Sequence, residues 1–174
     1  MPRNIEIKAR VEDIQALTAK VTAIADRGPI EIIQDDTFFA CDSGRLKLRT
    51  FSTVEGELIF YRRNDQAGPK ESFYLRSPTP APDTMREALS LAYGQIGRVQ
   101  KRRTLFFVGR TRVHLDRVSG LGNFLELEIP LEEREPFDAG LREAHALMAR
   151  LFVDPSQLIE GAYLDLLASA RTSP

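Results

Sequence analysis

The stretch Asn4-Ile5-Glu6-Ile7-Lys8 opens the chain with polar and apolar side chains in alternation, and Glu126-Leu127-Glu128 repeats this alternation near the other end. Side chains two residues apart in a β-strand lie on the same face. In the first stretch, Glu6 and Lys8 therefore share one face and the isoleucines share the other. In the second stretch, both glutamates oppose the leucine. Each stretch predicts a strand with one charged and one apolar face.

Basic residues follow the same two-residue period in the strands between these stretches. Three in-phase sets occur: Arg45, Lys47 and Arg49; Lys101 and Arg103; and Arg112, His114 and Asp116. The charged face of such a sheet can meet water, or the sheet can close so that this face lines a polar lumen and helices cover the apolar face. Enclosed charges need partners. A polyanion bridged by divalent cations would pair with the basic and the acidic side chains together.

Length and composition restrict the classes of partner. A chain of 174 residues fits a single domain over 1–174. Its 24 basic and 25 acidic residues give a formal net charge of −1, which argues against nucleic acid or a membrane as a partner. The one cysteine, Cys41, excludes an internal disulfide and suits a reducing compartment, so we expect a cytoplasmic protein. No apolar run approaches the roughly 20 residues of a membrane helix.

Turn and cap residues divide the chain into strands and helices. Asp13 and Asp83 are expected to cap helices that end near Gly28 and Tyr93. Strands are expected over 3–11, 31–40, 44–51, 56–63, 70–77, 96–103, 104–110, 111–118 and 123–131. We therefore expect an α+β fold: a closed antiparallel β-barrel of eight or nine strands with helices packed outside it, including C-terminal helices over about 137–170.

Five motifs then stand in an order that resembles a known family. They are Asn4-Ile5-Glu6-Ile7-Lys8, Gly44-Arg45-Leu46-Lys47-Leu48-Arg49, Val99-Gln100-Lys101-Arg102-Arg103, His114-Leu115-Asp116, and Gly120-Leu121-Gly122-Asn123-Phe124-Leu125-Glu126-Leu127-Glu128. The first looks like the Glu-x-Glu-x-Lys signature of the CYTH superfamily, the triphosphate tunnel metalloenzymes. The set covers roughly residues 3–130, and the later motifs look closest to class IV adenylyl cyclase-like proteins.

The resemblance implies a tunnel that binds a triphosphate with basic residues and holds Mg²⁺ or Mn²⁺ with carboxylates. The residues that it implies for the triphosphate are Lys8, Arg45, Lys47, Arg49, Arg63, Lys101 and Arg103. Those that it implies for the metal are Glu6, Glu126 and Glu128, with Asp116 as a possible additional ligand. Catalysis would rest on Glu6 and on Lys8, the candidate general base in hydrolytic relatives.

Two positions need separate comment. Asn4 occupies the first glutamate position of the signature, which removes one formal charge and calls a second metal ion into question. Arg62 and Arg63 are adjacent in one strand, so one must face the lumen; we favour Arg63, because the phase of Leu58 and Phe60 is better suited to packing under a helix.

The resemblance leads us to expect a metal-dependent enzyme that converts ATP to cyclic AMP and pyrophosphate. Hydrolysis of thiamine triphosphate, a nucleoside triphosphate or tripolyphosphate is the alternative, since the two reactions differ only in the attacking oxygen. A non-catalytic polyphosphate- or nucleotide-binding module is the alternative from another class, and Asn4 keeps it open. The substrate is the expected small-molecule partner, and a homodimer would be common for the family.

Overall fold

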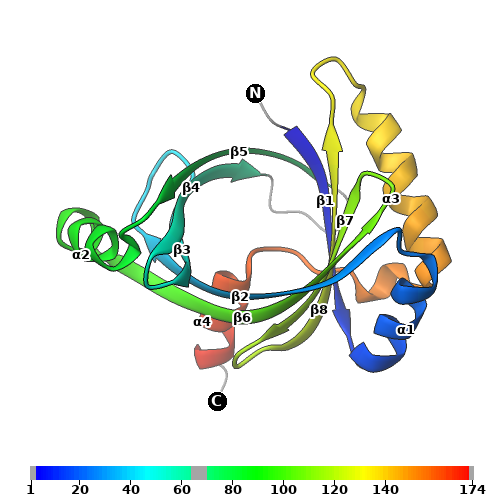
Figure 1. Ribbon diagram of the computed structural model, residues 1–174, viewed down its shortest axis with the longest axis horizontal. Helices are drawn as coiled ribbons and strands as arrows, with labels where there is room; N and C mark the ends of the chain where they lie inside the picture. The colour runs from blue at the N-terminus through cyan, green and yellow to red at the C-terminus, as the bar shows by residue number, and fades with distance from the viewer. Residues whose placement is uncertain (1–2, 64–69, 173–174) are drawn as a thin grey trace.

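Eight antiparallel strands form a closed ring in the computed structural model, which describes residues 3–63 and 70–172 (Figure 1). The order around the ring is β1-β5-β4-β3-β2-β6-β7-β8. The strands are β1 (Arg3–Val11), β2 (Arg27–Phe39), β3 (Arg45–Ser52), β4 (Glu55–Arg63), β5 (Lys70–Thr79), β6 (Gln95–Val108), β7 (Thr111–Val118) and β8 (Gly122–Leu131). The helices are α1 (Ile14–Ile24), α2 (Pro82–Tyr93), α3 (Phe137–Leu151) and α4 (Tyr163–Thr172), and a short 3₁₀ turn covers Pro155–Gln157. The expected closed α+β barrel is thus confirmed, with eight strands.

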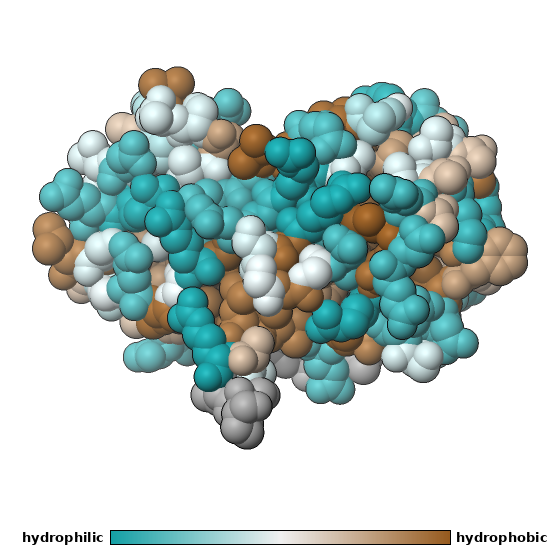
Figure 2. Space-filling view, turned by 90° about the horizontal axis from the view of Figure 1, so that it is seen from below, coloured by the Kyte–Doolittle hydropathy of each residue, from teal (hydrophilic) through white to brown (hydrophobic). Residues whose placement is uncertain are grey.

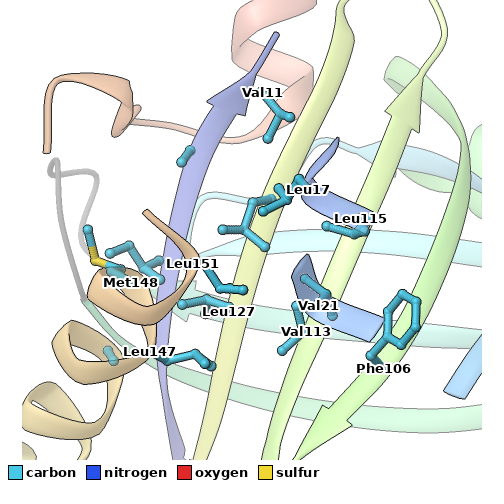
Figure 3. Packing of buried hydrophobic residues seen from close by; sticks show 14 of the residues in the cluster. Val11, Leu17, Val21, Phe106, Val113, Leu115, Leu127, Leu147, Met148 and Leu151 are labelled. Atoms are coloured by element: carbon cyan, nitrogen blue, oxygen red, sulfur yellow. The ribbon is translucent and has the colours of Figure 1, made fainter. Parts of the chain in front are cut away.

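The alternating residues of β1 lie on opposite faces of the barrel wall, as predicted. Ile5 and Ile7 are buried on the outside of the barrel, in a cluster that α1 and α3 cover. Figure 3 shows α1 and α3 residues of this cluster, among them Val21, Leu147 and Leu151, facing the strands. Burial of apolar side chains on this face stabilises the barrel by about 25 cal/mol per Å² of surface. The opposite face of the same strands is left to line the lumen.

A second, smaller apolar cluster closes one end of the lumen. Tyr163 at the start of α4 packs there with Phe38, Val99, Val118 and Phe124. These strand residues lie in the same phase as the predicted charged residues, so the lumen changes from charged to apolar toward α4. Helix α4 therefore covers that end of the barrel (Figure 1).

A glycine allows α4 to approach β6 closely. A Cβ atom on Gly97 would lie 2.2 Å from Cδ1 of Leu164, well inside van der Waals contact. A larger residue there would require the side chain of Leu164 to move.

Three details of the predicted elements were wrong. Helix α1 ends at Ile24 rather than near Gly28, because β2 already begins at Arg27. The separate strands expected over 96–103 and 104–110 are one strand, β6, because pairing with β2 continues without interruption through Arg103 and Thr104. Helix α2 has Ala81 rather than Asp83 at its N-cap; Asp83 lies in the first turn and accepts a hydrogen bond from Arg86. Asp13 caps α1 as expected, accepting from the backbone N–H groups of Gln15 and Ala16.

The surface gives two further observations. Within the described residues, no helix combines the length and apolarity needed to cross a membrane. Figure 2 shows hydrophilic side chains along a hollowed edge between the part of the molecule that carries α2 and the part that carries α1 and α3.

Candidate active site

The lumen contains a hollow of about 140 Å³ lined by charged side chains from both walls of the barrel. The charged residues that line it are Glu6, Lys8, Asp36, Lys47, Arg49, Arg76, Lys101, Arg103, Glu126 and Glu128. Asn4, Tyr61, Ser72, Tyr74 and Tyr163 add polar groups. We call this hollow the lumen pocket.

Asp116 holds two of the cations in place from behind. Its carboxylate accepts hydrogen bonds from Nε and Nη2 of Arg103, both at 2.7 Å, and from Nζ of Lys101 at 3.2 Å. Burial alone would raise the pKa of Asp116, but the charges of Arg103 and Lys101 hold it well below its usual range. Burial, followed by the charge of Arg103, lowers the pKa of Lys101 to about 7.

Asp36 holds two cations of β3, Lys47 and Arg49, in place. It accepts from Nζ of Lys47 at 2.7 Å and from Nε and Nη2 of Arg49, both at 2.8 Å. Burial opposes ionisation of Asp36, yet Arg49 and Lys47 keep its pKa far below the usual range. Burial and the charge of Arg49 lower the pKa of Lys47 to about 8. The two aspartates thus fix four cations in orientations facing the lumen pocket.

The glutamates of β8 lie on the other wall, next to β1. Residues Glu6 and Lys8 pair across the sheet with Glu128 and Glu126, and Nζ of Lys8 lies 3.5 Å from Oε2 of Glu126. Glu126 also accepts from Arg103 at 3.1 Å. Burial disfavours the charge of Glu126, but Arg103 and Lys8 hold its pKa well below the usual value, so the carboxylate is ionised.

His114 is a wall residue with a hydrogen-bonding role. Burial and the charge of Arg103 lower its pKa, which leaves the imidazole neutral near pH 7. Its Nδ1 lies 3.1 Å from Oε1 of Glu126 and must donate, because an ionised carboxylate only accepts. Arg112 forms a bidentate ion pair with Glu128, in which its Nε and Nη2 donate to the carboxylate oxygens at 3.1 and 2.6 Å. Both glutamates are therefore fixed from β7.

The donor atoms near β1 suit a hard divalent cation. Asn4 donates its amide N–H to Glu128, while its Oδ1 is buried and has no hydrogen-bond partner among the residues that the structure describes. Buried polar oxygens without a partner are rare, and an amide oxygen beside carboxylates is the kind of donor that Mg²⁺ binds. Within residues 3–63 and 70–172, no group of three His, Cys, Asp or Glu side chains stands close enough together to hold a metal by itself. The donors present fit Mg²⁺ or Mn²⁺ in chemical type, with phosphate oxygens needed to complete the ligand set.

Three of the sequence-predicted residues are placed differently from the rest. Arg45 does not line the lumen pocket; its guanidinium forms two hydrogen bonds with Asp165 of α4, at 3.1 and 2.7 Å. Asp116 also lies behind the lining, with no exposed surface, and its carboxylate contacts Lys101, Arg103 and the hydroxyl of Tyr163. Arg63 pairs with Ser72 in the sheet, but its side chain lies outside the described residues, so the preference for Arg63 stays a prediction. Its neighbour Arg62 is exposed and lies over the rings of Phe60 and Phe73.

Several residues that line the lumen pocket were not among the sequence-predicted site residues, and two of them, Tyr163 and Asp36, contact the charged network directly. Tyr163 donates its hydroxyl to Asp116 at 2.9 Å, and its ring centroid lies 4.1 Å from Nζ of Lys8 and 4.9 Å from Nζ of Lys101. No strand period could have placed a helix residue inside the barrel. Asp36 is the other residue, and it orients Lys47 and Arg49. Its phase with Phe38 in β2 was a usable signal, because both side chains line the lumen pocket.

Comparison with known proteins defines the class of protein that this fold and pocket represent. The family model of the CYTH domain matches residues 2–163, and the chain belongs to this family. CYTH proteins are generally enzymes that bind triphosphate substrates and typically use a divalent metal.

Individual relatives cover nearly the whole chain. Adenylate cyclase CyaB of Aeromonas hydrophila is 26% identical over 176 residues, covering 97% of this chain and 90% of that protein. The PH1012 protein of Pyrococcus horikoshii OT3 has a similar structure, with a TM-score of 0.82, 22% identity, and coverage of 94% of this chain and 99% of that one. A putative adenylyl cyclase from Hippeastrum, described with a dominant triphosphatase activity, gives a TM-score of 0.67 at 13% identity, covering 100% of this chain and 98% of that one.

Proposed function

We propose that this protein is a divalent-metal-dependent enzyme that binds an organic triphosphate in the lumen pocket and converts ATP to cyclic AMP and pyrophosphate. The observation that carries the proposal is that cations and carboxylates line one small pocket from opposite walls. On one wall, Lys47 and Arg49 are held by Asp36; on the other, Glu126 and Glu128 adjoin an unpartnered amide oxygen of Asn4. The 26% identity to an adenylate cyclase across nearly the whole chain supports the choice of reaction.

The cations of the pocket would bind the phosphates. Arginine offers a planar fork for two phosphate oxygens, and lysine offers a compact charge. Because Asp36 and Asp116 already orient Arg49 and Arg103, little side-chain entropy remains to be lost when the triphosphate binds. Fixed charges of this kind stabilise the negative charge that shifts among phosphate oxygens in the transition state.

Glu6, Glu126 and Glu128 are the proposed metal ligands, with Oδ1 of Asn4 as a further donor. A divalent ion bound there would polarise a phosphoryl oxygen and neutralise charge on the leaving pyrophosphate. Binding would draw Glu126 and Glu128 into contacts beyond their present ones with Arg103, His114 and Arg112. Mg²⁺ typically takes one or two carboxylates together with substrate phosphates.

The reaction requires removal of one proton. The 3′-oxygen of the ribose forms a bond to the α-phosphorus, the bond from that phosphorus to its bridging oxygen breaks, and pyrophosphate leaves with the electron pair. The hydroxyl proton must pass to a base. We propose that Lys8, which is buried and lies beside Glu126, receives this proton. To act as the base, Lys8 must be in its neutral form when ATP is bound.

Triphosphate hydrolysis is the second candidate, in which water attacks the γ-phosphorus, the bond from that phosphorus to its bridging oxygen breaks, and orthophosphate forms. The same pocket residues would serve it, and the similar fold of the Hippeastrum protein, with its described triphosphatase activity, favours retaining it.

Product analysis by phosphorus NMR separates the candidates. The protein is incubated with ATP, thiamine triphosphate or tripolyphosphate, each with Mg²⁺ or Mn²⁺. We expect cyclic AMP and pyrophosphate from ATP. Orthophosphate from any of the three would establish the hydrolase instead, and the absence of turnover with intact protein and metal would refute both and leave a binding module.

A further inference from the structure

The lumen pocket is too small for a complete organic triphosphate. Its volume is about 140 Å³, whereas pockets that enclose a ligand of that size measure roughly 300–1,000 Å³. The phosphates can fill the space between the cations, and an organic group attached to them must extend beyond it. The question is which neighbouring surface receives that group.

Two larger hollows share a residue with the lumen pocket. One shares Tyr61, has a volume of about 610 Å³ and is otherwise lined by Asp42, Gly44, Arg45, Arg62, Glu71 and Phe73. It lies at the end of the barrel where Arg45 is bonded to Asp165 of α4. This hollow does not continue the lumen.

The other hollow shares Arg76 with the lumen pocket and has a volume of about 500 Å³. We call it the Arg76 hollow; it is lined by Phe51, Val54, Glu55, Gly56, Glu57, Arg76, Pro78, Thr79 and Pro80. The strand register makes it a continuation of the lumen face. Glu57 pairs with Arg49 of β3 on one side and with Pro78 of β5 on the other, one step along the barrel from Ile59 and its partner Arg76.

The chemistry of the Arg76 hollow differs from that of the lumen pocket. Phe51, Val54 and Pro78 offer apolar surface, and Val54 is 71% exposed. Glu57 adds a carboxylate, which lies 3.3 Å from Nε of Arg76. A carboxylate repels phosphate but accepts hydrogen bonds from N–H and O–H groups, and flat rings pack well on aromatic and proline side chains.

We propose that the Arg76 hollow binds the organic part of the substrate, a flat ring system with amine or hydroxyl donors, as in a nucleoside. This inference rests on the proposed function and makes the protein selective for nucleoside triphosphates over inorganic tripolyphosphate. Arg76, which belongs to both hollows, lies where the phosphate chain joins the organic group.

The test compares the dissociation constants of ATP and tripolyphosphate by calorimetry, in EDTA to stop metal-dependent turnover. The wild-type protein should bind both. In Glu57→Gln and Phe51→Ala, the ratio of the ATP constant to the tripolyphosphate constant should rise, by about tenfold for the first variant, as expected for loss of a charged hydrogen-bond acceptor. The ratio is used because removal of a carboxylate beside Arg49 strengthens the binding of any polyanion.

Glu12→Gln is the matched control, since Glu12 is exposed and lies in neither hollow. Thermal unfolding of each variant verifies the fold, and Phe51→Ala provides an independent result if Glu57→Gln does not fold. A ratio that stays constant in the folded variants while both ligands bind would overturn this inference and leave the lumen pocket intact. Failure of both ligands to bind the wild-type protein, in EDTA and again with Mg²⁺, would overturn the proposed function together with the inference.

Discussion

Two groups of carboxylates lie inside this barrel, and they have different surroundings. Asp36 and Asp116 each meet one lysine and one arginine, through hydrogen bonds of 2.7 to 3.2 Å, and are almost completely buried. Glu126 and Glu128 also meet cations, but they line the lumen pocket beside an unpartnered amide oxygen of Asn4. The aspartates orient cations, and the glutamates are the metal ligands that we propose. Carboxylates on one sheet thus have two kinds of surroundings, distinguished by depth and by partner.

The largest effect on stability is expected at Asp116. In Asp116→Asn, the buried guanidinium of Arg103 and the ammonium of Lys101 lose their common counter-charge, and the free energy of unfolding should fall by about 3–5 kcal/mol. Urea unfolding measures this. Asp165→Asn is the matched control, because Asp165 pairs with Arg45 at a solvent-exposed position, and it should change stability by about 1 kcal/mol or less. Equal effects of the two substitutions would refute the distinction between buried and exposed pairs.

A large effect on activity, with the fold preserved, is expected at Glu126. The Glu126→Gln variant can still accept from Arg103 and His114, but it loses the charge that a divalent ion requires. Product formation should fall by about 10²-fold or more. Because Lys8 and Arg103 lose a counter-charge, the thermal midpoint should fall as well, so product is assayed at a temperature at which the variant stays folded. Assays of product and of unfolding are made on the same preparation. Full activity in a folded Glu126→Gln protein would remove this residue from the metal site.

Binding of triphosphate should weaken as the pH rises above 7. The pKa of Lys101 is lowered to about 7 in the free protein, and an anion bound beside it favours the protonated form and raises that pKa. Binding therefore takes up protons above pH 7, and the affinity for tripolyphosphate should fall by up to about tenfold per pH unit between about pH 7.5 and about 9.

Calorimetry in buffers of different ionisation enthalpy measures this proton uptake directly. Lys101→Arg provides the control, because arginine keeps its charge throughout the range. The pH dependence should become smaller, and the part that remains is expected from Lys47, whose pKa is lowered to about 8. Identical pH profiles for the two proteins would show that Lys101 is not the titrating group.

The smallest effect is expected at Tyr163, which joins α4 to the cation network. Tyr163→Phe keeps the ring beside Lys8 and Lys101 but loses the hydrogen bond to Asp116, and should cost about 1 kcal/mol of stability. Tyr93→Phe is the control, since Tyr93 is 57% exposed and should leave the urea midpoint unchanged. If the two variants were equally stable, the hydroxyl of Tyr163 would make no contribution to the stability of the fold.

The sequence predicted the ring of strands because the fold depends on a period of two that every strand repeats. The phase of Glu6 and Lys8 against Ile5 and Ile7 was sufficient to assign the lumen and core faces. The position of a side chain along the barrel axis, by contrast, depends on the stagger of the strands and on the helices that close the ends of the barrel. For that reason Arg45, in phase with Lys47, was not recognised as a partner of α4.

The partners of each charge were also beyond prediction from one sequence. Asp116 shares the phase of Arg112 and His114. Its carboxylate nevertheless contacts two cations of the neighbouring strand β6, Lys101 and Arg103, rather than the lumen pocket. Asp36 lies beside Lys47 and Arg49 only because β2 pairs with β3 in one particular register. Tyr163 enters the pocket from a helix more than thirty residues beyond the last strand.

The most direct test of the contrast between the two groups of carboxylates is Mn²⁺ binding, followed by electron paramagnetic resonance in the presence of tripolyphosphate. The wild-type protein should bind Mn²⁺ together with the anion, Glu126→Gln should lose this bound signal, and the exposed-site control Glu12→Gln should retain it. Retention of the full signal in a folded Glu126→Gln protein would place the metal elsewhere and contradict the account.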